Sequence, residues 1–371
     1  MHLGPQMLTS SRWLELTGQN SSHSIPASLA RFSFPIRRRS ADDRLMELIV
    51  VASSGNVMIT NAAVSPRGRL FGNFPRWTDV PTPSVGEATA EGGFTPFPGG
   101  EWNEWRPGLP SQGRFVCTHG LHADRDDNLW VIDDASPHHG PMVEGGAKLV
   151  KIDLATNRVS RVYALCPDLA PPGAVLSHLR VDARFLYVTD SGFGAIAVVD
   201  RETGRGHRAL QGARCSRADT SIVPVIHGQP MRHPDGKVPL IHLSHLELSP
   251  DGTWMYFTPL FGPVLWRVET KYLQDPSLAG DQIVAHVEEV VRIPPVTGIT
   301  SGANGTLYFS ALTEDGVLML APNGKLATLI RDERISGPNE GSIGPDGCYY
   351  FPNSQARRIN RPYEVFKVTL T

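Results

Sequence analysis

Four titratable side chains stand at equivalent places in a pattern that recurs along the chain. Each stands at or just before a short apolar run that leads into a tight turn, and the four are His119, His178, His245 and Glu340. Imidazole titrates near neutral pH, so histidine is suited to general acid–base catalysis, and neutral imidazole also binds transition metals. Glu340 could carry a proton, bind a cation or orient the imidazole of His119 or His245. We therefore take these four as candidate catalytic residues.

Other polar residues occupy the same positions in the pattern. Three hydroxyl side chains could bind carbonyl or hydroxyl groups of a substrate: Ser177, Ser244 and Thr297. A divalent metal, calcium or zinc, would take its ligands from Glu340, Asn339 and Asn61. No other cofactor is indicated, because no phosphate-binding loop or dinucleotide fingerprint follows a suitable strand. The alternative for each of these residues is a structural hydrogen bond inside a buried channel.

The surrounding pattern occurs six times. A short apolar strand is followed by a turn with Gly, Asp or Asn and by a second strand rich in aromatic and β-branched residues, which is typical of β-hairpins. The six copies cover residues 61–71, 120–133, 178–190, 245–257, 298–309 and 340–351. Repeats that stack radially to bury both faces of each sheet are typical of propellers. The alternative is a pair of β-sandwiches, which six near-equivalent repeats disfavour.

We therefore expect an all-β fold, a six-bladed β-propeller whose ring is closed by N- and C-terminal strands. Residues 45–52 and 363–370 both have the composition of strands, and we expect them to pair in the last blade. The predicted domains are a disordered or poorly structured extension at residues 1–43 and the propeller at residues 44–371. The first polar side chain of each inner strand would then point to one axis, at the mouth of the central channel.

Composition limits the partners. A net charge of -2 over 371 residues gives no electrostatic basis for nucleic-acid binding. No apolar run is long enough to span a membrane, and none follows a basic start as in an export signal. We expect a small-molecule ligand or substrate, no nucleic acid, no membrane and a monomer. The cysteines form no CxxC pair, which leaves inert thiols or disulfides for Cys117, Cys166, Cys215 and Cys348.

Several motifs resemble those of the Yellow/major royal jelly protein family. Phe74-Pro75-Arg76-Trp77 is similar to the PRW signature of that family, and residues 127–133 (DNLWVID) resemble its DRLWVLD stretch. Residues 187–192 (YVTDSG) and 248–252 (LSPDG) are similar to two further motifs, and the order of motifs fits across residues 44–371. The resemblance implies a six-bladed propeller. It adds Arg76 and Trp77 as candidate substrate-binding residues, with a structural Arg–Trp clamp as the alternative.

The resemblance allows three functions. Family members include dopachrome-converting, tautomerase-like enzymes, which favours a small-molecule enzyme that transfers protons at the channel mouth. A metal-dependent lactonase of the gluconolactonase type is the second hypothesis, although Thr60 or Asn61 stands where those enzymes have a first-blade Glu. The third is a non-catalytic propeller that binds a small ligand. Family members are commonly secreted, but no signal peptide is visible, so the cytoplasm is an alternative location.

Overall fold

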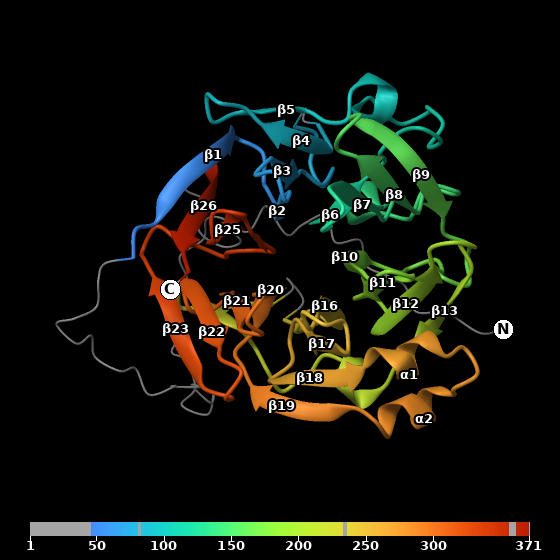
Figure 1. Ribbon diagram of the computed structural model, residues 1–371, viewed down its shortest axis with the longest axis vertical. Helices are drawn as coiled ribbons and strands as arrows, with labels where there is room; N and C mark the ends of the chain where they lie inside the picture. The colour runs from blue at the N-terminus through green and yellow to red at the C-terminus, as the bar shows by residue number, and fades with distance from the viewer. Residues whose placement is uncertain (1–45, 81–82, 233–235, 356–360, 371) are drawn as a thin grey trace.

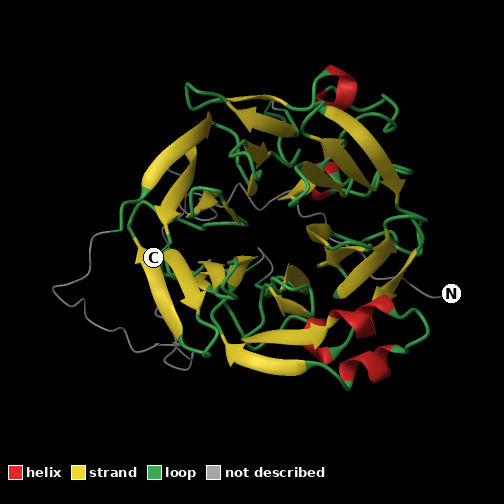
Figure 2. Cartoon of the chain, viewed as in Figure 1, coloured by secondary structure: helices red, strands yellow, loops and turns green. Residues whose placement is uncertain are grey.

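Six four-stranded antiparallel sheets surround a common axis. The computed structural model describes residues 46–80, 83–232, 236–355 and 361–370. The sheets follow one another around the ring; in the first five the first strand in chain order lies nearest the axis, and in the sixth the first strand lies outermost (Figures 1 and 2). The prediction of an all-β, six-bladed propeller is confirmed. The extension predicted at residues 1–43 lies outside the described residues.

Each of the first three blades contains four strands in chain order. Blade one consists of β2 (Asn61–Val64), β3 (Leu70–Asn73), β4 (Val85–Ala88) and β5 (Phe94–Pro96). Blade two consists of β6 (Thr118–Ala123), β7 (Asn128–Asp133), β8 (Lys148–Asp153) and β9 (Arg158–Ala164). Blade three consists of β10 (Leu176–Val181), β11 (Phe185–Asp190), β12 (Ala195–Asp200) and β13 (Gly206–Ala209).

The next two blades repeat this order. Blade four consists of β16 (Leu243–Leu248), β17 (Trp254–Pro259), β18 (Val264–Glu269) and β19 (Glu288–Arg292). Blade five consists of β20 (Val296–Ser301), β21 (Leu307–Ala311), β22 (Gly316–Leu320) and β23 (Leu326–Arg331). A small separate hairpin, β14 (Val225–Ile226) and β15 (Gln229–Pro230), lies in the insertion between blades three and four.

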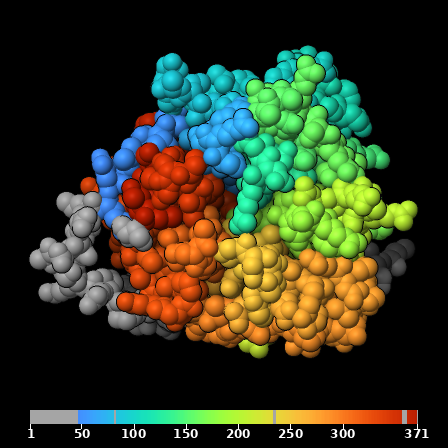
Figure 3. All heavy atoms as spheres, viewed as in Figure 1, coloured from blue at the N-terminus to red at the C-terminus, as the bar shows by residue number. Residues whose placement is uncertain are grey.

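Both ends of the chain build the sixth blade. It contains β24 (Ser342–Ile343), β25 (Cys348–Asn353), β26 (Tyr363–Thr369) and, as its outermost strand, β1 (Ile49–Gly55). Strands β1 and β26 are antiparallel, with Ile49 opposite Lys367 and Gly55 opposite Tyr363. In the space-filling view the blue N-terminal segment lies against the red C-terminal one (Figure 3). The predicted closure of the ring by these two strands is therefore confirmed.

The hydrophobic core lies between neighbouring blades. One cluster joins Trp130 and Ile132 of β7 to Leu179 and Val188 of blade three, and similar clusters fill the other junctions. Near the axis, neighbouring inner strands approach so closely that one of the two must have a glycine at the point of contact. A Cβ at Gly298 would lie 2.8 Å from the Cα of Glu340, so glycine allows β20 to approach the segment that carries Glu340.

Helices are short in the described part of the chain. They are α1 (Thr270–Gln274), α2 (Gly280–Val284) and the 3-10 turns η1 (Gly100–Asn103), η2 (Pro137–His139) and η3 (Arg214–Ser216). No described helix has the length and apolar character needed to cross a membrane. All four cysteines are described and none forms a disulfide; Cys166 is exposed and the others are buried.

Phe366 tests the energetic role of the closing blade. Its ring is fully buried in β26, between the sheets of blades five and six. We expect Phe366→Ala to lower the free energy of unfolding by about 3–5 kcal/mol, because truncation leaves a cavity where the ring packs. Urea denaturation measures this. Lys367→Ala on the same strand, which removes a surface ion pair and an exposed contact with the Tyr350 ring, is expected to cost less than about 1 kcal/mol. Equal losses in the two variants would contradict this role.

Candidate functional site

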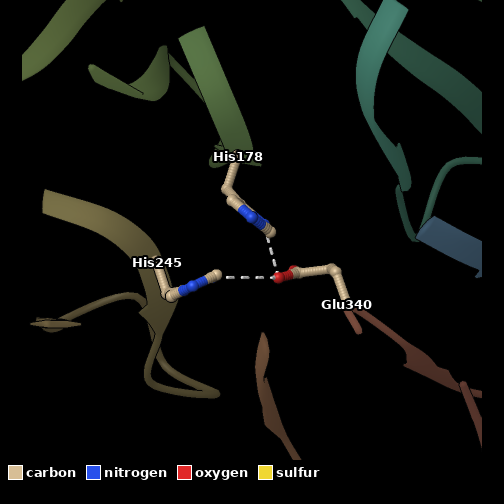
Figure 4. A group of neighbouring side chains, drawn as sticks. All are labelled: His178, His245 and Glu340. Carbon is tan, nitrogen blue, oxygen red and sulfur yellow. Dashed lines mark ion pairs between the residues drawn. The ribbon is translucent and has the colours of Figure 1, made fainter. Parts of the chain in front are cut away.

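Three side chains from three parts of the ring meet at the axis. His178 extends from β10, His245 from β16, and Glu340 from the segment just before β24, and the three point toward one another (Figure 4). His178 Nδ1 lies 2.5 Å from Glu340 Oε2, and His245 Nδ1 lies 3.9 Å from the same oxygen. The two imidazole rings meet edge to face, with their centroids 4.4 Å apart. We call this group the central triad.

Register shifts in β10 and β16 determine the directions in which the His178 and His245 side chains point. The pairing of β10 with β11 shifts register between Leu176 and Leu179, and the pairing of β16 with β17 shifts between Leu243 and His245. Such bulges turn side chains away from the regular alternation and are common next to functional sites. The backbone of Glu340 is fixed separately, because its carbonyl accepts a hydrogen bond from the Ala62 amide at 3.0 Å.

Arg180 and Glu247 support the central triad from one side. Arg180 Nη2 lies 2.5 Å from Glu340 Oε1 and 2.9 Å from Glu247 Oε2. The same nitrogen donates a hydrogen bond to the carbonyl of Ile299 at 2.8 Å, so Arg180 connects blade three to blade five. Arg180 therefore fixes one oxygen of Glu340 and leaves Oε2 facing the imidazoles.

Burial and charge set the protonation states. Burial lowers the pKa of His245 to about 4, with a further contribution from the neighbouring His178, so His245 is neutral at neutral pH. Burial alone would raise the pKa of Glu340, but His178 and Arg180 outweigh it and hold that pKa well below the usual range. Burial raises the pKa of Glu247, although Arg180 opposes the shift. At neutral pH the triad thus contains an ionised carboxylate beside a neutral imidazole.

Several polar atoms of the triad are buried without a well-aligned hydrogen bond. They are Glu340 Oε2, His178 Nδ1, and Nδ1 and Nε2 of His245. His178 Nδ1 and Glu340 Oε2 are in close contact, but the contact does not have the geometry of a hydrogen bond. Buried polar atoms usually have partners, and exceptions are concentrated where a ligand, ion or water completes the site.

A cavity of about 530 Å³ opens on the face where the inner strands end. Arg180, Glu247 and Glu340 form part of its wall, together with His122 and the turns that connect each inner strand to its neighbour. Burial lowers the pKa of His122 to about 3, with Arg180 adding to the shift, so its imidazole is also neutral. A cavity of this volume suits a small molecule.

The position of this cavity differs from the expected mouth of the channel. The predicted mouth was the end where the inner strands begin, whereas the cavity lies at the opposite end of the channel. Glu340 and Arg180 border it, while His178 and His245 stand behind them. The start of a strand fixes which residues approach the axis but not which end of the channel is open.

His119 makes contacts of its own and does not join the central triad. Its Nδ1 lies 3.3 Å from Asp134 Oδ2, and its ring meets the edge of Trp77 at 5.2 Å between centroids. Trp77 stacks on His139 at 4.5 Å. Burial lowers the pKa of His139 to about 4. Glu340 therefore contacts His178 and His245, and the carboxylate beside His119 is that of Asp134.

Two of the hydroxyl candidates form hydrogen bonds within the protein. Ser177 Oγ lies 3.1 Å from Ser191 Oγ, and Thr297 Oγ1 donates to the carbonyl of Ser310 at 3.2 Å. Thr297 also donates to the carbonyl of Pro338. Ser244 is buried at the equivalent position of β16. These contacts hold the beginnings of the inner strands together.

The two asparagine candidates differ. Asn339 Oδ1 accepts a hydrogen bond from the Glu340 amide at 2.8 Å, which restricts its use as a cation ligand. Asn61 forms a backbone bridge with Glu340, and its Oδ1 is buried without a hydrogen bond. Of the oxygen ligands predicted from the sequence, Glu340 and Asn61 keep an unused atom.

Arg76 and Trp77 do not form a pair. The guanidinium of Arg76 lies over the ring of Trp105 at 5.7 Å, and its Nε donates to the carbonyl of Val116 at 3.1 Å. Arg76 thus braces the loops between blades one and two. Trp77 belongs with His119 and His139 instead.

Arg180 and Glu247 were not among the predicted site residues. Each stands two positions after a triad histidine, on the same strand. Because side chains alternate along a strand, residues two apart share a face, and both would point toward the axis. That alternation was the signal that could have identified them.

The triad can hold a proton or a cation. A carboxylate beside an imidazole stabilises the imidazolium, which makes His178 a suitable proton acceptor. Two imidazoles and one carboxylate are also ligands for a transition metal. The three ligand-type atoms lie within 4.8 Å of one another.

Comparison with solved structures identifies the fold. A putative gluconolactonase superposes with a TM-score of 0.53 at 12% identity, covering 87% of this chain and 92% of that one. A gluconolactonase from Xanthomonas campestris gives 0.50 at 14%, covering 88% and 90%. A streptogramin B lyase gives 0.51 at 14%, covering 88% and 98%. These low identities establish a shared propeller fold only.

Sequence comparison establishes the family. No curated protein matches the chain. The family model for the major royal jelly protein matches residues 116–330, which is more than half of the chain and includes the strands that carry His178 and His245. The chain belongs to the major royal jelly protein family.

Proposed function

We propose that this protein is an enzyme that transfers a proton on a small molecule bound in the central cavity. The observation that carries the proposal is the buried Glu340 carboxylate, held by Arg180 on one oxygen and facing two imidazoles with the other. The best-supported subclass is a tautomerase or isomerase, in keeping with the dopachrome-converting enzymes of the family. Such reactions need a base and an acid of tuned basicity in a site that excludes bulk water.

The three side chains have separate roles in this proposal. Glu340 borders the cavity and takes the proton from the substrate, and His178 behind it receives that proton as an imidazolium that Glu340 stabilises. His245 is neutral and faces the same oxygen of Glu340, so it acts on the substrate only through that carboxylate. Arg180 and Glu247 keep Glu340 ionised and in place, so they act as positioning residues.

The wall of the cavity supports a small uncharged or oxygen-bearing substrate. His122 offers a neutral imidazole with a donor and an acceptor nitrogen. Ser249 and Ser301 add hydroxyl groups. Arg125 and Arg201 also line the wall and could pair with a carboxylate on the substrate.

The activity of a Glu340→Gln variant tests this proposal. We expect its turnover of dopachrome, followed by loss of colour, to fall by about 10²–10⁴-fold, because the amide cannot stabilise an imidazolium. Glu288→Gln, which alters an exposed ion pair on the outermost strand β19, should leave turnover unchanged. Thermal melts establish that both variants are folded. Full turnover by a folded Glu340→Gln protein would reject the assignment.

Binding without turnover is the outcome that separates an enzyme from a binding protein. If calorimetry detects saturable binding of dopachrome to the wild-type protein and no product forms, the pocket is a ligand site without catalysis. Loss of that binding in His178→Asn would still place the ligand at the central triad. We expect product to form.

Lactone hydrolysis is the second candidate function. It is favoured by the two imidazoles and one carboxylate, which have the ligand types that metal-dependent hydrolysis requires. The gluconolactonase structures share the fold with this chain.

A direct assay distinguishes this second candidate. Gluconolactone hydrolysis would be followed by acid release in a pH-stat, before and after chelation of metal ions. A lactonase would lose activity on chelation and regain it on addition of Zn²⁺. Acid release at the uncatalysed rate in the presence of Zn²⁺ would exclude this candidate.

A further inference from the structure

The central triad contains more unused polar atoms than a closed hydrogen-bonding arrangement would. Glu340 Oε2, His178 Nδ1 and both ring nitrogens of His245 are buried and have no well-aligned partner. His178, His245 and Glu340 are 6%, 2% and 1% exposed, so bulk water does not serve these atoms. Leaving a buried polar atom unpaired costs about 1–3 kcal/mol for each atom. An ion or small molecule bound between the three side chains would remove that cost.

The geometry of the triad suits a single small ion. One ligand-type atom from each residue lies within 4.8 Å of the others. Bonds of about 2.0–2.2 Å from nitrogen and oxygen to Zn²⁺ would draw such atoms around one centre after small rotations of the side chains. The three residues come from separate blades, so the rigid ring and not a flexible loop sets their spacing.

We propose that His178, His245 and Glu340 bind one divalent transition-metal ion, with zinc as the best fit. Two imidazoles favour zinc, cobalt or nickel over calcium, which prefers six to eight oxygen ligands. This ligand set differs from the one predicted from the sequence, in which Glu340, Asn339 and Asn61 were the ligands. Asn339 Oδ1 is engaged by the Glu340 amide, whereas Asn61 Oδ1 is unpaired and stands beside Glu340 as a further oxygen donor.

The charges around the triad also favour a cation. Glu340 and Glu247 share one guanidinium, that of Arg180, so carboxylates outnumber guanidinium groups beside the triad. Arg180 holds Glu340 Oε1 and leaves Oε2 for the metal, which is the usual arrangement of an outer partner behind a carboxylate ligand.

This inference goes beyond the proposed function and rests on it only for the location of the site. Atoms that bind a metal cannot accept a proton, so the proton-transfer roles given above are those of the metal-free protein. Metal binding is measured without a substrate, so the two proposals fail independently. Binding of metal by a protein that turns over no substrate would reject the enzyme and keep the metal site. Turnover by a protein that binds no metal would keep the enzyme and reject the metal site.

Cobalt is a suitable probe because Co²⁺ in a site with imidazole ligands absorbs visible light. The full chain, treated with a chelator and then freed of it, would be titrated with Co²⁺ alone. We expect one equivalent to bind and to be displaced by Zn²⁺. In His245→Ala and Glu340→Gln we expect the Kd for Co²⁺ to rise by at least about 100-fold, which is the upper end of the cost of losing an outer-shell partner.

His119→Ala is the matched control, because it removes an inner-strand histidine that lies outside the triad. We expect its Kd for Co²⁺ to equal that of the wild-type protein. If a triad variant fails to fold, as judged by its thermal melt, His245→Gln replaces it, since the amide keeps the size and polarity of the site.

Three results would overturn the metal site. The first is the absence of stoichiometric Co²⁺ and Zn²⁺ binding by the folded wild-type protein. The second is unchanged Co²⁺ affinity in the folded triad variants. The third is loss of binding in His119→Ala alone, which would move the ion to the group around Asp134 and His139.

Discussion

A buried carboxylate at the centre of the ring governs the rest of the site. Glu340 is 1% exposed, and an ionised carboxylate in such a place must be compensated by charge or hydrogen bonds. Arg180 supplies that compensation on one oxygen, and the imidazoles of His178 and His245 face the other. Because Arg180 also binds Glu247, the five side chains form one connected group across blades three, four and six. Removing any charge from it would leave another buried charge unpaired.

The propeller positions this group through its inner strands. Hydroxyl groups hold the strand beginnings together: Thr297, a candidate for substrate binding, donates to the carbonyl of Pro338, and Ser310 Oγ donates to the carbonyl of Asn339 at 2.8 Å. Gly298 lets β20 pack against the backbone of Glu340. The site is therefore rigid because several blades fix the same short segment, and loops contribute mainly to the cavity wall. Rigid support of this kind is what catalytic and metal sites require.

Much of the fold could be predicted from the sequence, because its signals are local. Turns such as Ser-Pro-Asp-Gly at residues 249–252, with strands on either side, mark one hairpin per blade, and the strand composition of residues 363–370 indicated the closing partner of β1. His178, His245 and Glu340 were identified because their positions in the repeat are equivalent. His119 occupies the same position, yet it turns to Asp134, since a repeat fixes where a residue lies along its strand but not which neighbour its side chain meets. The open end of the channel depends on all blades together, and for that reason no single repeat could indicate it.

A crystal structure of the protein loaded with Co²⁺, with data collected at the cobalt absorption edge, tests the central claim most directly. The claim is that the functional centre is the triad on the axis. The account predicts one anomalous peak bonded to His178, His245 and Glu340, at about 2.0–2.2 Å from each ligand atom. A peak beside His119 and Asp134, or an empty triad with all three side chains hydrogen-bonded to ordered water, would contradict it.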